Sequence, residues 1–321
     1  MPVADGQFAL GRFADGGRVF PGLVLASERV ADLSAAFASM HEILERWDEV
    51  EDGLEELGAE PRGLDGLRVL PPVEPRQILQ SGANYHRHVV ELAVDQGIGR
   101  EPGMTIEAHR ANVIRMMDER VAHGEPYVFL GAVSALAGAY DDVVLPARGE
   151  QHDWELELAA VIGRGGRDVP RDRALEHVAG YTICNDITTR DLVHRPDLGP
   201  IGSDWVRAKN SPTFLPTGPW LVPARFVPDP MNLQIRLELN GEVMQDESTA
   251  DMIFDVARLV SYASERVELL PGDLLLTGSP AGNGTHWNRF LRDGDVMEGS
   301  ITGLGAQRNR CRSAAGVGAG A

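Results

Sequence analysis

Glu155 and Glu157 alternate in an otherwise apolar segment, Trp154-Glu-Leu-Glu-Leu-Ala-Ala-Val-Ile162. In a β-strand alternate residues share one face, which would place the two carboxylates side by side, about 6.8 Å apart along the chain. One interpretation is an ordinary half-exposed strand whose acids face water. The same face continues as Ala159 and Val161, however. An apolar continuation indicates that the face turns into the protein and takes both carboxylates with it.

Asp186 adds a third carboxylate directly after an apolar run, Tyr181-Thr-Ile-Cys-Asn185. Two buried carboxylates about 4 Å apart repel by roughly 4 kcal/mol at an effective dielectric constant of 20. Such a pair is neutralised by a proton or by a cation between its members. Three carboxylates without nearby Cys or clustered His suit a hard ion, Mg²⁺ or Mn²⁺, with Ca²⁺ as a further candidate. We therefore expect Glu155, Glu157 and Asp186 to bind a divalent metal ion.

A histidine and a glutamate three residues apart, His88 and Glu91, lie in the segment Asn84-Tyr-His-Arg-His-Val-Val-Glu91. On a helix these two residues are neighbours on one face. A carboxylate beside an imidazole orients the ring and raises its basicity, so the pair could activate water. The alternative is a solvent-facing helix with an incidental pair, and His86 is the nearest competing histidine.

Two basic residues, Arg190 and Lys209, follow the third carboxylate along the chain. In so acidic a protein, bases beside a carboxylate cluster could bind the carboxylate of a substrate, and Arg could do so with two parallel hydrogen bonds. The alternative is that they neutralise Asp186 and Asp191 and serve the structure alone.

A glycine-rich segment, Pro271-Gly-Asp-Leu-Leu-Leu-Thr-Gly-Ser-Pro-Ala-Gly-Asn-Gly284, reads as a turn, a strand and a loop. The backbone N–H groups of such a loop are accessible to a ligand. No Gly-Lys-Ser/Thr follows, and no helix pattern begins there, so neither a Walker loop nor a dinucleotide fingerprint is present. A plain tight loop is the alternative.

The elements that must position these residues follow from the apolar periodicity. Short apolar runs alternate with Gly/Pro-rich turns from Ile78 onward and predict one large β-rich domain. The predicted strands are 127–130, 142–145, 155–162, 180–185, 220–222 and 233–239, and the predicted helices are 85–95, 105–123 and 251–264.

The N-terminal part shows a different sequence pattern. A hairpin is predicted over 7–25 around Asp15-Gly16-Gly17, a helix over 34–56 and a proline-rich linker at 71–75. The end of the chain is a small-residue, low-complexity stretch. We therefore expect a small N-terminal domain at 1–75, a catalytic domain at 76–311 and a disordered tail at 312–321.

The chain carries a formal charge of −18, which repels phosphate backbones and argues against nucleic-acid binding. Its two cysteines, Cys184 and Cys311, lack CxxC spacing and fit reduced thiols. We see no signal-peptide pattern and no run near the roughly 20 apolar residues that a membrane helix needs. These features predict a soluble cytoplasmic protein without a membrane or nucleic-acid partner.

Taken together, the motifs resemble the fumarylacetoacetate hydrolase family over roughly 78–307. Five segments carry the resemblance in the family's order: Gly82-Ala-Asn-Tyr-His-Arg-His-Val-Val-Glu91, Asp153-Trp-Glu-Leu-Glu-Leu-Ala159, Gly180-Tyr-Thr-Ile-Cys-Asn-Asp-Ile-Thr-Thr-Arg-Asp191, Ala208-Lys-Asn210 with the later Pro216-Thr-Gly-Pro219, and Leu276-Thr-Gly-Ser-Pro-Ala-Gly-Asn-Gly284. No single segment would suffice, but five in order are specific.

The resemblance implies an α+β, mainly β fold of packed mixed sheets, a homodimer and a divalent ion, usually Mg²⁺. It places the three carboxylates on the metal and makes His88 with Glu91 the water-activating dyad. It also implies that Lys209 lies near a substrate oxygen. The remaining expected substrate contacts are Arg190, Tyr85, Thr277 and Gly278.

Two departures from the family pattern bear on the substrate. Many members carry a lysine where Gly131 stands in Val128-Phe-Leu-Gly-Ala-Val-Ser134. The stretch 98–126, near the lid expected after His88, is also longer than in compact members. Both features affect the charge and the size of the substrate that the site would accept.

The function that these features favour is metal-dependent hydrolysis of a carbon–carbon bond in a 2,4-dioxo acid, an acylpyruvate. Decarboxylation of oxaloacetate, tautomerisation of an unsaturated oxo acid and dehydration of a sugar acid use the same kind of site. The residues His88 and Glu91 favour hydrolysis, because decarboxylation needs no activated water. A hypothesis of another class is a non-catalytic protein whose carboxylates hold a structural ion.

Overall fold

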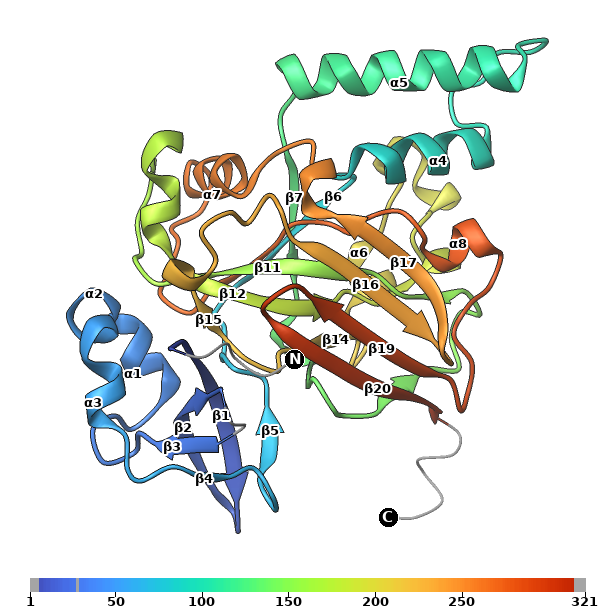
Figure 1. Cartoon of the computed structure of the whole chain (residues 1–321). Coiled ribbons are helices and arrows are strands. Elements are labelled where there is room, and N and C mark those ends of the chain that lie inside the picture. The colour runs from blue at the N-terminus through green and yellow to red at the C-terminus, as the bar shows by residue number, and fades with distance from the viewer. Residues whose placement is uncertain (1–5, 27–28, 315–321) are drawn as a thin grey trace.

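The computed structural model describes residues 6–26 and 29–314 of the 321-residue chain. Two large sheets form the main body, and a third, N-terminal sheet lies beside it (Figure 1). The expected fold class, α+β and mainly β with mixed sheets, is confirmed. No helix in the described ranges is long and apolar enough to cross a membrane.

The central sheet carries the candidate site and has the strand order β7-β6-β18-β11-β12-β14-β8, with β15 paired to β12. Its pairings are mixed, since β6 runs parallel to β18 while β11 runs antiparallel to both of its neighbours. Its strands are β6 (Ile78–Gly82), β7 (Tyr127–Gly131), β8 (Leu136–Gly138), β11 (Leu156–Ile162), β12 (Val178–Asn185), β14 (Leu215–Thr217), β15 (Val222–Pro223) and β18 (Leu274–Leu276).

The second large sheet packs on the central one and has the order β17-β16-β19-β20-β9. Leu156 and Leu158 of β11 belong to the same apolar cluster as Ile235 and Leu237 of the second sheet, so the main core lies between the two sheets. The strands are β9 (Val143–Leu145), β16 (Gln234–Leu239), β17 (Glu242–Ser248), β19 (Val296–Ile301) and β20 (Gly305–Ser313), and a separate small ribbon pairs β10 (His152–Asp153) with β13 (Thr188–Thr189).

Helices α4 and α5 pack against each other and form a hairpin that projects from the top of the molecule in Figure 1. The α-helices are α1 (Met40–Glu45), α2 (Trp47–Val50), α3 (Leu54–Leu57), α4 (His86–Gln96), α5 (Ile106–His123), α6 (Trp205–Lys209), α7 (Val256–Ser264) and α8 (Gly284–Trp287). Short 3₁₀ turns are η1 (Glu51–Gly53), η2 (Val133–Ala135), η3 (Arg171–His177), η4 (Arg190–Leu192), η5 (Pro196–Ile201), η6 (Ala224–Phe226) and η7 (Thr249–Asp251).

The N-terminal part confirms the predicted hairpin and, in part, the predicted helix. Gly16 and Gly17 both have positive φ and connect β1 to β2, as a two-residue hairpin turn requires. The helical stretch expected at roughly 34–56 is confirmed in part: helix begins only at Met40, where Ser39 caps it, and the stretch is divided into the short helices α1, α2 and α3. The strands of this sheet are β1 (Phe8–Asp15), β2 (Arg18–Leu25), β3 (Arg29–Asp32), β4 (Arg62–Gly63) and β5 (Arg68–Leu70).

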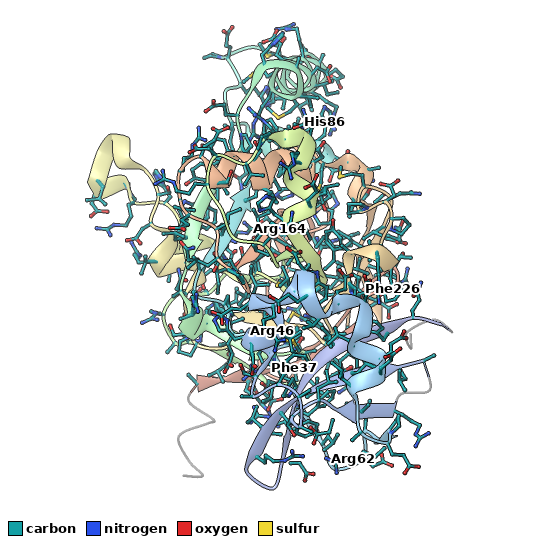
Figure 2. The ribbon with its side chains drawn as sticks, turned by 90° about the vertical axis from the view of Figure 1, so that its left-hand side faces the viewer. Phe37, Arg46, Arg62, His86, Arg164 and Phe226 are labelled. Atoms are coloured by element: carbon teal, nitrogen blue, oxygen red, sulfur yellow. The ribbon has the colours of Figure 1, made fainter. Side chains whose placement is uncertain are left out.

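The N-terminal sheet and its helices share a core with the central sheet. One apolar cluster joins Leu10 and Ile43 to Val161 and Leu276. Arg164 also forms an ion pair with Asp48 of α2, with 2.8 Å between Nη2 and Oδ2. Figure 2 labels Arg164 and Phe226 on the part of the main body that lies nearest to Phe37 and Arg46 of the N-terminal part. The region before the linker at 71–75 is therefore packed against the rest.

The end of the chain differs from expectation in its first residues. Arg312 and Ser313 were expected in the tail, but both belong to β20, which pairs with β9 up to Ser313 and Leu145. The pairing extends the strand because each residue gains a ladder hydrogen bond. Residues 315–321 of the expected tail lie outside the described residues.

Candidate active site

The register of β11 and β12 brings the three predicted carboxylates together. Leu156 pairs with Asn185, and the backbone N–H of Asp186 donates to the carbonyl oxygen of Glu155 over 2.9 Å. Glu157 follows on the same face of β11. One carboxylate oxygen from each of the three lies within 4.8 Å of the others, and all three side chains are buried.

Lys209 fills the space between two of these carboxylates. Its Nζ donates to Oε2 of Glu155 and to Oδ2 of Asp186, at 2.6 Å in each case. Lys209 is the only lysine in the sequence, and it is buried. Every other basic side chain of the Lys and Arg type is an arginine, so this position uses the compact ammonium group where the chain otherwise uses guanidinium.

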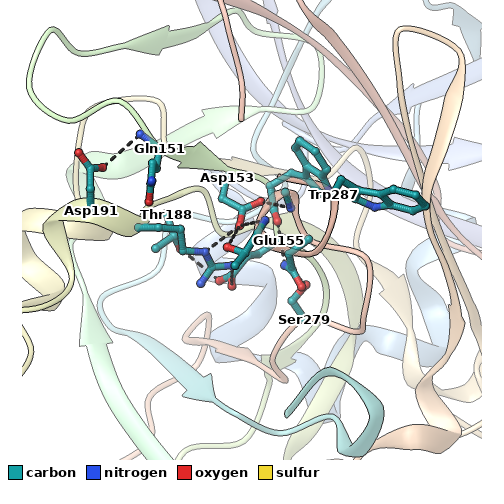
Figure 3. Close-up of polar contacts among 12 residues, drawn as sticks. Gln151, Asp153, Glu155, Thr188, Asp191, Ser279 and Trp287 are labelled. Carbon is teal, nitrogen blue, oxygen red and sulfur yellow. Dashed lines mark hydrogen bonds and ion pairs between the residues drawn. The ribbon is translucent and has the colours of Figure 1, made fainter. Parts of the chain in front are cut away.

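Arg190 holds Glu155 from the other side. Its Nη2 donates to Oε1 of Glu155 at 2.6 Å, and its Nε donates to Oδ2 of Asp153 at 2.7 Å. Figure 3 shows Asp153 and Glu155 close together, with dashed lines that mark their contacts with neighbouring residues. Asp191 is engaged elsewhere, because it accepts hydrogen bonds from the backbone N–H groups of Glu150 and Gln151.

The charges of the cluster are unequally distributed. Burial opposes ionisation of Glu155, but the positive charges of Arg190 and Lys209 outweigh it and lower its pKa to about 2. Burial and the negative charges of Asp186 and Glu155 raise the pKa of Glu157 well above its ordinary value. Burial also raises the pKa of Asp186 to about 6. Two of the three carboxylates therefore lack sufficient positive charge nearby.

The donor set fits a hard divalent cation. Four buried carboxylates, those of Asp153, Glu155, Glu157 and Asp186, are balanced by only two cationic side chains. One divalent ion would supply the two missing charges, and closely grouped carboxylate oxygens are the ligands that such an ion prefers. Glu155, Glu157 and Asp186 would hold it, in agreement with the sequence-based expectation.

Backbone and amide groups hold the carboxylates from behind. Oε2 of Glu157 accepts a hydrogen bond from the backbone N–H of Gly278 over 2.7 Å. Oδ1 of Asp186 accepts one from Nε2 of Gln80 over 2.7 Å. Gly278 has a φ of 90°, where L side chains are strained, so glycine allows the loop after β18 to turn its N–H toward the cluster.

The side chain of Gln80 also occupies the space beside Gly131. A Cβ atom at position 131 would lie 2.7 Å from Oε1 of Gln80 and 2.9 Å from its Cδ. The amide of Gln80 is buried, and its Oε1 has no hydrogen-bond partner in the described structure. The position at which family members often carry lysine is therefore closed by a neutral amide that itself holds Asp186.

Asp153 is a buried carboxylate that the sequence did not single out. Its Oδ1 accepts from the backbone N–H of Gly284 over 2.5 Å, and its Oδ2 accepts from Thr285 and Arg190. It thereby ties the start of α8 to the guanidinium that holds Glu155. Its position at the head of the Asp-Trp-Glu-Leu-Glu motif was the available signal, but strand alternation alone does not distinguish it from the two glutamates that follow.

His88 lies on the first turn of α4 and lines the cavity above the carboxylates. Burial and the positive charge of Arg190 lower its pKa to about 4, which leaves the imidazole neutral at neutral pH and able to accept a proton. His86, the competing histidine, lies 3.5 Å from Asp118 of α5 and is not among the residues that line this cavity.

The predicted dyad is close in space but is not hydrogen-bonded. Across the described residues the structure has no hydrogen bond between His88 and Glu91; Oε1 of Glu91 accepts instead from Nε of Arg87 over 2.8 Å. Both dyad residues line a second, smaller cavity, which His286 also lines. His286, whose Nδ1 lies 3.7 Å from Oε2 of Glu91, was missed because it falls outside any recognisable motif.

The main cavity has a volume of about 180 Å³, which is room for a small organic acid. Its lining combines a charged floor with an apolar wall. The floor is formed by Glu155, Glu157, Arg190 and Lys209, and the wall by Val89, Leu92, Tyr127, Phe129 and Trp205. None of the described lining residues comes from 98–126; that segment forms α5, which packs beside α4.

Two of the expected substrate contacts lie behind the cavity wall. The hydroxyl of Thr277 donates to the carbonyl oxygen of Leu158 over 2.9 Å, and Thr277 is fully buried. Tyr85 is also fully buried, and burial raises the pKa of its hydroxyl. Neither residue lines the cavity. Their direct contact with a substrate therefore stays a prediction.

Comparisons with known proteins find similarity over most of the chain. The family model described as "Fumarylacetoacetate (FAA) hydrolase C-terminal" matches residues 77–312. A 2,4-didehydro-3-deoxy-L-rhamnonate hydrolase from Sphingomonas sp. (strain SKA58) is 36% identical over 313 residues, which are 93% of this chain and 94% of that protein.

Two further comparisons extend the picture. A mitochondrial oxaloacetate tautomerase from Bos taurus is 40% identical over 188 residues, which are 58% of this chain and only 59% of that protein. The solved structure of a fumarylacetoacetate hydrolase from the psychrophile Exiguobacterium antarcticum superposes with a TM-score of 0.77 at 31% identity, covering 95% of this chain and 99% of that one. The fold expected from the sequence motifs is thereby confirmed.

Proposed function

The chain belongs to the fumarylacetoacetate hydrolase family, and from this premise we propose that it is a divalent-metal-dependent hydrolase of 2,4-dioxo acids. The observation that carries the proposal is the buried cluster of Glu155, Glu157 and Asp186, whose two glutamates line the same cavity as His88. The cluster lacks two positive charges, and the neutral histidine faces the space where a substrate would lie.

The proposed reaction is a hydrolysis. The oxygen of water forms a bond to carbon 4 of the substrate, the bond between carbons 3 and 4 breaks, and its electron pair passes to carbon 3. A proton is then added to carbon 3, so that one water and one acylpyruvate give one carboxylic acid and one pyruvate. When bound, a divalent cation supplies Lewis-acid polarisation of the 2-oxo group.

The side chains of the site have separate tasks in this reaction. His88 accepts the proton that water loses on attack, and Glu91 stabilises the resulting positive charge from the next turn of α4. Lys209 provides a positive charge beside the substrate oxygen on which negative charge develops. Arg190 fixes Glu155 and faces the substrate carboxylate.

The name of the Sphingomonas relative supports the substrate class. It denotes a hydrolase of an acid that is deoxygenated at carbon 3 and oxidised at carbons 2 and 4, which is the 2,4-dioxo pattern. Three finer features are proposed on the sequence and the family alone: Mg²⁺ as the ion, with Mn²⁺ and Ca²⁺ as alternatives, a homodimer, and a cytoplasmic location.

The test is a spectrophotometric assay of acetylpyruvate and oxaloacetate in parallel, each with Mg²⁺ and with EDTA. Acetylpyruvate enol absorbance should fall only with Mg²⁺, and the products should be acetate and pyruvate. Turnover of oxaloacetate but not of acetylpyruvate would replace the hydrolase by a decarboxylase or tautomerase. Mg²⁺ binding without turnover of either compound would favour another 2-oxo acid reaction or a structural ion.

A further inference from the structure

The cavity has no free cation to receive a second carboxylate. Of its described lining residues, only Arg190 and Lys209 are Lys or Arg side chains. Arg190 is engaged by Asp153 and Glu155, and Lys209 by Glu155 and Asp186. Both cations are thus neutralised by the floor of the site, where the 2-oxo acid head group would lie.

The charge balance of the site also argues against a second carboxylate on the substrate. The four buried carboxylates of the site, Asp153, Glu155, Glu157 and Asp186, and its two cations leave two net negative charges, which one divalent ion would cancel. The carboxylate of a 2-oxo acid then adds one negative charge beside the ion. A second carboxylate at the far end of the substrate would be desolvated without a counterion, which is unfavourable in a partly buried cavity.

One wall of the cavity is aromatic, and two of its polar groups contact each other. Nε1 of Trp205 donates to the hydroxyl of Tyr127 over 2.7 Å. The rings of Trp205 and Phe129 are stacked, with 4.8 Å between centroids and 16° between planes. Val89 and Leu92 of α4 complete this wall. This wall therefore offers an apolar surface to the far arm of a substrate, while the remaining lining of the cavity includes the uncharged polar side chains of Ser81 and Ser279.

Strand β7 carries part of this wall. It has one further position on the same face, and that position has no charged side chain. Tyr127 and Phe129 line the cavity, and Gly131 is the next residue of β7 on the same face, since alternate strand residues share a face. The space beside Gly131 is filled by the neutral amide of Gln80. The third position of the wall is thus closed without a positive side chain.

We propose that the site selects 2-oxo monocarboxylic acids whose far arm is uncharged and apolar, and that it rejects dicarboxylic acids. This inference rests on the proposed function, because it assumes that the 2-oxo acid head group lies on the carboxylate floor. It adds the chemical class of the substrate's far arm, which is determined by the aromatic wall of Tyr127, Phe129 and Trp205. Leu92 and Val89 face the same arm from α4.

The test uses binding and needs no turnover. Oxamates copy the head group of a 2-oxo acid, and two of them form an isosteric pair: N-(3-methylbutyl)oxamate ends in an isopropyl group, and N-(2-carboxyethyl)oxamate ends in a carboxylate of similar shape. Their affinities for the Mg²⁺-loaded protein are measured by isothermal titration calorimetry. Oxalate, which has a head group and no arm, serves as the reference.

We expect the neutral oxamate to bind at least about tenfold more tightly than the carboxylate, a difference that a buried charge without a partner readily produces. Leu92→Arg, which places a cation on the wall, should reverse the preference, and Leu92→Met is the matched neutral control. Val89→Arg tests the same point should Leu92→Arg fail to fold, as judged by circular dichroism.

Two other outcomes of the binding experiment would contradict the proposal. Equal affinities of the two oxamates, or tighter binding of the carboxylate, with oxalate bound normally would overturn the arm selectivity and leave the proposed function standing. Absence of Mg²⁺-dependent binding for all three compounds would overturn the proposed head-group site, and this inference with it.

Discussion

The ammonium nitrogen of Lys209 lies 2.6 Å from Oε2 of Glu155, and both side chains are buried. The same nitrogen lies 2.6 Å from Oδ2 of Asp186. A cationic side chain therefore already serves two of the three carboxylates that would bind a metal ion. The stabilising effects of Lys209 and of the ion should be coupled, because both act on the same negative charges. Each should therefore contribute less when the other is present.

Replacing Lys209 by Met should make this coupling visible. Loss of one member of a buried ion pair leaves a charge uncompensated and costs about 3–5 kcal/mol, so the metal-free variant should unfold at a lower urea concentration in EDTA. The site also becomes more negative, so its affinity for Mg²⁺ should rise. Urea unfolding with and without Mg²⁺, together with calorimetric titration, measures both effects. A variant as stable as the parent in EDTA would contradict the assigned pairing.

Glu157→Gln should abolish metal binding without weakening the fold. Because burial and two neighbouring carboxylates already raise the pKa of Glu157, a neutral amide of the same shape should leave the metal-free protein equally stable or more stable. Loss of a direct ligand should lower Mg²⁺ affinity by more than the roughly 10–100-fold that loss of an outer contact costs. Glu298→Gln, at an exposed surface pair with Arg308, is the control. Normal Mg²⁺ affinity and turnover in Glu157→Gln would remove this residue from the metal site.

His88→Ala should separate chemistry from metal binding. Loss of a proton-accepting side chain lowers kcat by about 10²–10⁴-fold, while Mg²⁺ affinity should remain within a few-fold of the parent. His86→Ala is the control, since His86 contacts Asp118 rather than the cavity. Glu91→Gln should lower kcat by a smaller factor, about tenfold, because its carboxylate bonds to Arg87 in this conformation. Full activity of His88→Ala would exclude it as the proton acceptor.

Gly131→Ala should act on Asp186 through Gln80. The added methyl group would meet the amide of Gln80 at 2.7 Å and displace it from Asp186. Loss of that hydrogen bond should cost about 1–2 kcal/mol and lower Mg²⁺ affinity several-fold. Gln80→Ala should have a similar effect, and the double variant should be no worse than Gln80→Ala alone. Strictly additive losses in this double-mutant cycle would show that the two positions act independently.

Both cysteines should be unreactive in the native protein. Burial raises the pKa of the Cys184 thiol, and burial with the negative charge of Asp295 raises that of Cys311 to about 12. At pH 8 the reactive thiolate is therefore nearly absent in the folded state, whereas an unfolded thiol with a pKa of about 8.5 is partly ionised. Labelling with a disulfide reagent at pH 8 should be slow without denaturant and fast with it. Rapid labelling of either native thiol would contradict its described burial.

The parts of the site that follow strand periodicity could be predicted from the sequence. Glu155 lies directly before β11 and Glu157 lies on it, and the apolar continuation of their face correctly indicated burial. Asp186 follows an apolar strand, and the antiparallel register then brings it opposite Glu155. In such a strand, local pattern and tertiary position agree, so the pattern is informative.

The parts that depend on long-range contacts could not be predicted. Gln80, Asp153 and His286 reach the site through sheet order and loop packing, and no local pattern encodes which strands become neighbours. The helical stretch expected at 34–56 starts late and is interrupted for local reasons that composition does not reveal. Ser39 caps the first helix, and Arg46 adopts a non-helical conformation between α1 and α2.

The central claim is that water cleaves a carbon–carbon bond of an acylpyruvate in a metal-dependent reaction. The most direct measurement is mass spectrometry of the acetate formed from acetylpyruvate in ¹⁸O-labelled water, with Mg²⁺ and with EDTA. The account predicts acetate that carries one ¹⁸O atom in its carboxyl group, formed with Mg²⁺ and absent with EDTA. Acetylpyruvate that is recovered intact with Mg²⁺, while the same protein consumes oxaloacetate, would contradict it.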